Sequence, residues 1–212
     1  MQVQITPELA LMFGTPILFR TLANAAALNA GLERAILSRA ETGIGSRISN
    51  IGGWQSLHDF LDWPEPEIAQ LKIEMDRGIQ NISAMPMLVQ GRVPATVDRV
   101  NYSAYGWANV NQHGHYNVPH VHTASDWSVV YYVSPGHPSP DTPTNGRFEL
   151  RDPRPLAIFT RTPGFTSGQS VQIKPHAGLM LIFPSWIEHW VHPFHGEGNR
   201  ISIAVNVSLD RK

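Results

Sequence analysis

The pattern of apolar residues changes near residue 90, and this change constrains the fold more than any other feature of the chain. Before it, apolar residues recur three or four positions apart in two stretches, as on one face of a helix. The first stretch contains Leu28, Leu32, Ala35 and Ile36, and the second contains Ile68, Leu71, Met75, Ile79 and Ile82. After it, short runs rich in apolar and β-branched residues are separated by turns. The sequence therefore predicts N-terminal helices followed by a sheet-rich part.

The short runs also predict the kind of sheet. In the run from Arg200 to Leu209, apolar residues alternate with mainly polar ones, which is typical of a strand with one face in a core. Several short strands at such spacing are typical of a sandwich or jelly roll. We expect one α+β domain over residues 1–212, mainly β, with a helical support over 1–90 and a jelly-roll core over 91–212. Two helices alone bury too little apolar surface to fold independently.

Composition excludes several classes of protein. The 212 residues include no cysteine, which rules out disulfides, iron–sulfur clusters and thiolate zinc sites and leaves histidine and carboxylates as the strong metal ligands. The net charge is −1 and no basic patch is visible, so no nucleic-acid partner is expected. No run of 18 apolar residues and no secretory signal are present, so we expect a cytoplasmic protein without membrane contact. A homodimer is the base-rate expectation for such a chain.

Histidine is concentrated in the second half of the chain, where nine of ten lie between His113 and His195. His120 and His122 are two residues apart, so in an extended strand they point to the same side, as adjacent metal ligands must. His189 follows an apolar strand and is a candidate third ligand. Arg200 and Ser202 come shortly after it on one face of the last strand. This order of residues suggests a metal site with a cation near it.

The order and spacing of these segments resemble the iron(II)- and 2-oxoglutarate-dependent dioxygenases, specifically their bacterial and phage branch related to prolyl hydroxylases. The resemblance extends from about Trp107 to Leu209. Its motifs are His120-Val-His122, Tyr131-Tyr132-Val133, Asn145-Gly146-Arg147-Phe148, His189 and Arg200. It implies a double-stranded β-helix that uses Fe(II) and 2-oxoglutarate to hydroxylate an unactivated C–H bond. The substrate would be a small molecule or a protein or peptide side chain.

The resemblance also implies roles for individual residues. His120, His122 and His189 would bind the metal. Arg200 would pair with the far carboxylate of 2-oxoglutarate, because its planar fork suits a carboxylate. Ser202 and Tyr132 would contact the same carboxylate, and Trp107 and Asn109 are candidate contacts to substrate or co-substrate. Beyond these, Phe183, Trp186 and Trp190 are candidate apolar walls that keep the site dry.

The chain departs from the family at His122, where a carboxylate usually stands. Either His122 binds the metal itself, or His120 and His189 bind it with water or an anion, or a carboxylate from elsewhere completes the site. The candidate carboxylates are Asp126, Asp152 and Glu188. We favour three histidines, which leave iron one charge more positive. The identity of the metal stays open, since imidazole also suits zinc, copper and nickel.

Two other functions remain compatible with the sequence. One is a cupin-like metal protein, a three-histidine dioxygenase or an isomerase, that does not use 2-oxoglutarate. The other is a jelly roll that binds a metal or ligand without turnover. Arg200 and Ser202, at the expected place after His189, favour the 2-oxoglutarate-dependent oxygenase.

Overall fold

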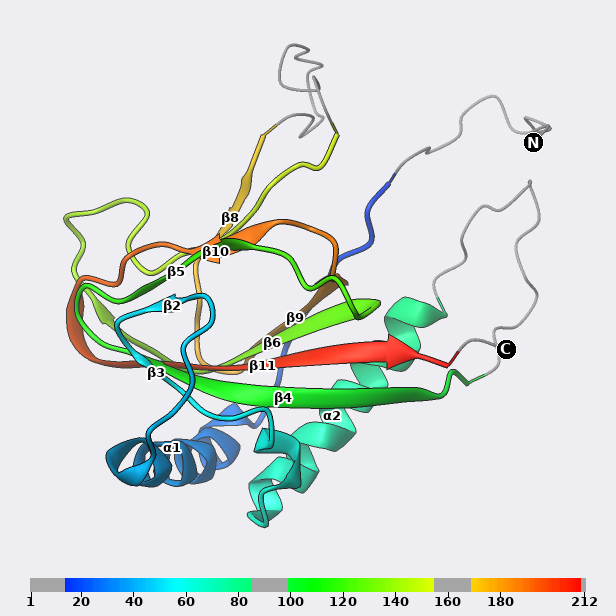
Figure 1. Ribbon diagram of the computed structural model, residues 1–212, viewed down its shortest axis with the longest axis horizontal. Helices are drawn as coiled ribbons and strands as arrows, with labels where there is room; N and C mark the ends of the chain where they lie inside the picture. Colours follow the sequence, from blue (N-terminus) through cyan, green and yellow to red (C-terminus); the bar gives the residue numbers. More distant parts are fainter. Residues whose placement is uncertain (1–13, 85–98, 155–168, 211–212) are drawn as a thin grey trace.

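A computed structural model describes residues 14–84, 99–154 and 169–210. Within these ranges the chain forms two long helices and two antiparallel sheets that lie one above the other (Figure 1). The helices are α1 (Ala25–Thr42) and α2 (Pro66–Ser83), and a short 3₁₀ helix spans Phe60–Asp62. Neither α-helix is both long enough and apolar enough to cross a membrane.

Eleven strands make up the two sheets in the described part of the chain. They are β1 (Leu18–Thr21), β2 (Asn50–Ile51), β3 (Trp54–Gln55), β4 (Tyr102–Asn111), β5 (Tyr116–His120), β6 (Trp127–Pro138), β7 (Phe148–Leu150), β8 (Val171–Ile173), β9 (Leu179–Pro184), β10 (His189–Val191) and β11 (Gly196–Leu209). The larger sheet has the order β1-β9-β6-β11-β4-β3, and the smaller one has the order β2-β5-β10-β7-β8. The predicted double-stranded β-helix is confirmed. Strands β1, β2 and β3 also join the sheets, although they precede residue 90.

The two helices form where the sequence predicts them and cover the outer face of the larger sheet (Figure 1). Helix α1 ends at Thr42, and the N–H of the following Gly43 donates to the carbonyl of Arg39. Helix α2 begins with Pro66, and proline suits the first turn because it lacks the N–H, which would have no partner within the helix at that position. The apolar stripes of both helices share one buried cluster with the outward-facing residues of the larger sheet, which on β11 are Ile201, Ile203, Val205 and Val207.

A second apolar core lies between the two sheets. Tyr132 on β6, Phe148 on β7 and Phe183 on β9 are all buried there. The inner face of β11 carries Arg200, Ser202, Ala204 and Asn206 toward this space, as its alternating pattern predicts. The larger sheet is therefore buried on both sides, and the polar residues of β11 lie in the interior of the jelly roll.

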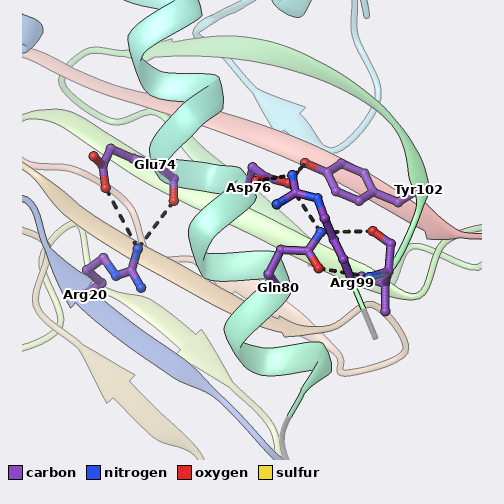
Figure 2. Close-up of polar contacts among 7 residues, drawn as sticks. Arg20, Glu74, Asp76, Gln80, Arg99 and Tyr102 are labelled. Carbon is purple, nitrogen blue, oxygen red and sulfur yellow. Dashed lines mark hydrogen bonds and ion pairs between the residues drawn. The ribbon is translucent and has the colours of Figure 1, made fainter. Parts of the chain in front are cut away.

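Helix α2 is tied to the start of β4 by a group of polar contacts (Figure 2). Asp76 accepts hydrogen bonds from Arg99 at 2.7 Å and from the Tyr102 hydroxyl at 3.1 Å. Gln80 bonds both backbone groups of Val100 at 2.9 Å. These contacts fix the helix against the strand that carries Trp107 and Asn109.

The Asp76 carboxylate gives this connection a predictable pH dependence. Burial by itself raises the pKa of Asp76, but the hydrogen bonds from Arg99, Gln80 and Tyr102 and the Arg99 charge together lower it. Because the folded pKa lies below the unfolded one, the stabilisation is present at neutral pH and is lost as pH falls through the folded pKa. We expect Asp76→Asn to cost about 1 kcal/mol at pH 7.

Urea unfolding at pH 7 and pH 3 checks this prediction. The difference in unfolding free energy between the wild type and Asp76→Asn should shrink at pH 3, because below the ordinary pKa of an aspartate the unfolded chain takes up a proton more readily than the folded chain does. A difference of the same size at both pH values would show that the ionised carboxylate is not what stabilises the contact.

Candidate metal centre

Three histidines converge between the sheets, on neighbouring strands of the smaller sheet. His120 ends β5, His122 follows two residues later, and His189 begins β10. Strands β5 and β10 are antiparallel, and His189 lies directly opposite His120. One ring nitrogen from each of the three histidines lies within 4.8 Å of the others. The structure thus brings together the three predicted ligands from separate parts of the sequence.

Hydrogen bonds fix which nitrogen of each ring is free. The Nδ1 atom of His120 lies 2.7 Å from the carbonyl of Val118, and Nδ1 of His189 lies 2.8 Å from the carbonyl of Ile187. A carbonyl can only accept, so each Nδ1 carries the proton and each Nε2 keeps its lone pair. Backbone partners of this kind commonly orient histidines that bind metals.

In His122, a side chain rather than a backbone carbonyl holds the proton on Nδ1. Its Nδ1 lies 2.5 Å from Oδ1 of Asn206 on β11. Its Nε2 is buried and has no hydrogen-bond partner within the described part of the chain. A buried nitrogen without a partner is costly unless a ligand satisfies it. The three rings therefore present three lone pairs to a common space.

The three rings are neutral at pH 7. Burial, followed by the charge of neighbouring histidines, lowers the pKa of His189 to about 3, despite the opposing hydrogen bond to Ile187. Burial also lowers the pKa of His122 to about 4, against the opposing effect of Asn206. Burial lowers the pKa of His120 as well. Neutral imidazole is the form that binds a metal, so no proton has to be displaced from these nitrogens at pH 7.

The residues predicted to hold a co-substrate line the same cavity as the histidines. Ser202 on β11 lies between Asn109 on β4 and Tyr132 on β6 in the register of the larger sheet. These three residues, Arg200 and Trp107 all line this cavity with the three histidines. The larger sheet therefore supplies its polar wall, and the smaller sheet supplies the histidines.

Arg200 is the most unusual group in this cavity. Only 1% of its surface is exposed, its Nε donates to the carbonyl of Gly146 at 3.2 Å, and its Nη2 has no partner among the described residues. Burial lowers its pKa, but a guanidinium stays charged in proteins. Burial also raises the pKa of Tyr132 to about 12, against the lowering effect of the nearby Arg200, so its hydroxyl stays protonated. Among the described residues, neither this hydroxyl nor Nη2 of Arg200 has a well-formed hydrogen bond. Two such donors at a buried positive charge favour an anion.

Aromatic side chains close the opposite side of the histidine cluster. The Trp107 ring is stacked on His122, with centroids 5.6 Å apart and planes 15° apart. His58 and Tyr105 continue this surface outward along a groove that shares His120 and His122 with the cavity. Asn109 lies on the cavity side, and its Oδ1 is buried without a partner among the described residues.

The three alternative carboxylates do not join the cluster. Asp126 accepts the backbone N–H of Leu209. Glu188 pairs with Arg151, and Asp152 pairs with Arg154. Within the described ranges, the group able to hold a metal consists of the three histidines alone.

The predicted apolar walls differ in where they lie. Phe183 packs against His189 with ring centroids 5.0 Å apart but does not line the cavity, whereas Phe148, 5.5 Å from the same ring, does line it. Trp186 is 54% exposed and does not line the cavity, because it lies in the turn after β9. Trp190 points away from the cavity and bonds His192 instead.

Asn206 is the site residue that the sequence analysis missed. It lies six positions after Arg200 on the same face of β11, so strand alternation already placed it on the inner side. Its contact with His122 joins residues 84 positions apart, and such a contact has no local signal in the sequence.

A comparison with known protein families matches the part of the chain that contains the candidate site. Residues 105–206 match the model of a family described as "Putative 2OG-Fe(II) oxygenase". No functionally curated protein matches the sequence.

Similar solved structures cover nearly the whole chain, although the sequence identities are low. A prolyl-4-hydroxylase from Pseudomonas putida has 16% identity and a TM-score of 0.61, covering 92% of each chain. A prolyl hydroxylase from Trichoplax adhaerens, in complex with a peptide of hypoxia-inducible factor, has 14% identity and a TM-score of 0.61, covering 91% of this chain and 83% of its own. HygX from Streptomyces hygroscopicus, with nickel and 2-oxoglutarate bound, has 13% identity and a TM-score of 0.58, covering 92% and 83%. At these identities the likeness concerns the fold.

Proposed function

We propose that this chain, which belongs to the family of 2OG-Fe(II) oxygenases, uses Fe(II) and 2-oxoglutarate to hydroxylate an unactivated C–H bond. The substrate would be a small molecule or a protein or peptide side chain. One observation carries the proposal. A single cavity contains three neutral imidazoles with unused lone pairs and a buried arginine with an unused donor.

The three histidines fit an iron site. His120, His122 and His189 would hold Fe(II) through Nε2, because their Nδ1 atoms are already engaged. Three protein ligands leave other positions for co-substrate and oxygen. Because all three ligands are neutral, the metal would keep both positive charges, which favours an anionic co-substrate.

Arg200 fits the other end of 2-oxoglutarate. Its Nη2 and the Tyr132 hydroxyl would donate to the distal carboxylate, and Ser202 adds a hydroxyl from the adjacent position on the same strand face. A charge-assisted contact in a buried cavity is strong and directional. It would fix the orientation of the co-substrate relative to the histidines.

The chemistry follows from this arrangement. Bound Fe(II) and 2-oxoglutarate supply, with O₂, the oxidising power for C–H hydroxylation, and 2-oxoglutarate is converted to succinate and CO₂. The protein's own part is positioning and exclusion of water. Phe148 and Phe183 cover His189, and the Trp107 ring covers His122. These apolar faces would limit the contact of water with His122 and His189.

A cupin-like protein that needs no 2-oxoglutarate would share the three histidines. It would leave unexplained why a charged arginine is buried in the same cavity with an unused donor. Burying a charge without a partner is costly. The arginine therefore favours a site that receives a carboxylate.

The test is anaerobic binding of 2-oxoglutarate to the iron-loaded protein, followed by measurement of succinate after oxygen is added. We expect binding that requires iron, and succinate formation that is lost in His189→Ala and retained in His137→Gln. His137 is an exposed histidine outside the cluster, which makes it the matched control. Binding without succinate, with or without candidate substrates, would indicate a ligand-binding protein. Absence of 2-oxoglutarate binding would indicate the cupin-like alternative.

A further inference from the structure

We propose that Asn206 is a positioning residue that holds His122 in the tautomer able to bind a metal. Asn206 would thereby make an imidazole usable at the position where the family usually has a carboxylate. This inference rests on the proposed metal site, and it concerns how this chain in particular compensates for the missing carboxylate.

His122 differs from the other two histidines in how its tautomer is fixed. His120 and His189 each bond the carbonyl of the residue two positions earlier in the chain. A carbonyl cannot donate, so the backbone itself keeps the proton on Nδ1 of these two residues. The ring of His122 has no such backbone partner among the described residues and bonds only the side chain of Asn206.

An amide side chain can support either tautomer of a histidine ring, so the orientation of the Asn206 amide determines which tautomer His122 adopts. With Oδ1 toward His122, the proton is on Nδ1 and Nε2 has the lone pair. With Nδ2 toward His122, the proton would move to Nε2, which could then not bind a metal. In the structure, Nδ2 of Asn206 donates to the hydroxyl of Tyr105 at 2.9 Å, and Oδ1 lies toward Nδ1 of His122.

The surroundings support this role. Asn206 is 5% exposed, so water does not readily replace its oxygen as the acceptor. Tyr105 lies directly opposite Asn206 in the register of β4 and β11. The Trp107 ring is nearly parallel to His122 and restricts rotation of its plane. Asn206 therefore fixes which ring nitrogen of His122 carries the proton, while Trp107 fixes the plane of the ring.

The experiment uses the metal-free protein and three variants. Asn206→Leu removes the acceptor at similar volume, and Asn206→Val is a second such variant suited to a strand. Asn206→Asp keeps an oxygen acceptor for the Nδ1 proton. The readouts are Co(II) affinity by competition titration and the ¹⁵N chemical shifts of the His122 ring, which report its tautomer.

We expect Asn206→Leu and Asn206→Val to lower Co(II) affinity 10- to 100-fold, the usual cost of losing a group that orients a metal ligand. Asn206→Asp should stay within a few-fold of the wild type. The control is Asn111→Leu, which removes a different buried asparagine, on β4, that bonds Asn117 and not the cluster. It should leave Co(II) affinity unchanged whatever it does to thermal stability.

The ¹⁵N shifts decide the inference even without a metal. The wild type should carry the His122 proton on Nδ1, and Asn206→Leu should lose this preference. An unchanged tautomer in both apolar variants, or an equal loss of Co(II) affinity in Asn206→Asp and Asn206→Leu, would overturn the role of Asn206. Failure of the wild type to bind Co(II) would instead count against the proposed metal site, while the shifts would still test Asn206.

Discussion

Arg200→Met should abolish most 2-oxoglutarate binding while leaving metal affinity unchanged. Removing one partner of a buried charged contact costs about 2–5 kcal/mol, which corresponds to a loss of about 30-fold to several thousand-fold in affinity. Arg200 lines the cavity but does not contact the histidine nitrogens through any hydrogen bond found among the described residues. Isothermal titration of the metal-loaded protein with 2-oxoglutarate measures the effect.

The same substitution also separates a binding role from a structural one. In the free protein, Arg200 is a buried cation with an unused Nη2. Replacing such a group with an apolar residue of similar volume is often neutral or stabilising. We therefore expect the unliganded Arg200→Met variant to be at least as stable as the wild type, apart from the lost bond to Gly146.

Arg200→Lys is the matched control for charge. Lysine keeps the positive charge but lacks the planar fork that pairs with a carboxylate at two points. Its affinity for 2-oxoglutarate should lie between those of the wild type and Arg200→Met. An equal loss of metal and 2-oxoglutarate binding in Arg200→Met would show that Arg200 acts through the fold.

His122→Ala should lower metal affinity on the order of 100-fold. Structural zinc sites gain about 10–16 kcal/mol from four ligands, so one ligand contributes roughly 3 kcal/mol. His122 is a neutral ring whose Nε2 is buried and faces the other two ligands. Competition titration with Co(II) measures the loss, and His137→Gln again serves as the control for an exposed histidine.

His122→Asp tests the same position by replacing the histidine with a carboxylate. It restores the usual family pattern of two histidines and a carboxylate, so we expect metal affinity close to that of the wild type. The carboxylate would remove one positive charge from the site. We therefore expect 2-oxoglutarate to bind several-fold more weakly than in the wild type, because Coulomb attraction between the metal and the co-substrate is reduced. Wild-type metal affinity in His122→Ala would instead show that His120 and His189 suffice.

Much of the fold followed from periodicity. The stripe from Ile68 to Ile82 lies on one buried face of α2, and the alternation from Arg200 to Leu209 separates the two faces of β11. The strands β1 to β3 could not be recognised in the same way. They are two to four residues long, and a segment of that length shows no period. Their partners in the sheets, such as β9 for β1, lie far away in the sequence.

The candidate site was predicted in its residues but not in its supporting contacts. Strand geometry placed His120 beside His122, and the order of segments brought in His189 and Arg200. The role of Asn206 depends on a hydrogen bond between two strands on different sides of the cavity. No local pattern encodes such a bond. For the same reason the sequence left Asp126, Asp152 and Glu188 open as ligands until their partners were known.

The most direct measurement is a crystal structure of the protein grown without oxygen in the presence of Fe(II) and 2-oxoglutarate, with anomalous scattering recorded at the iron edge. The three-histidine site predicts one strong peak bonded to Nε2 of His120, His122 and His189. It also predicts the far carboxylate of 2-oxoglutarate on Arg200. A peak that leaves His122 uncoordinated, or 2-oxoglutarate bound away from Arg200, would contradict it.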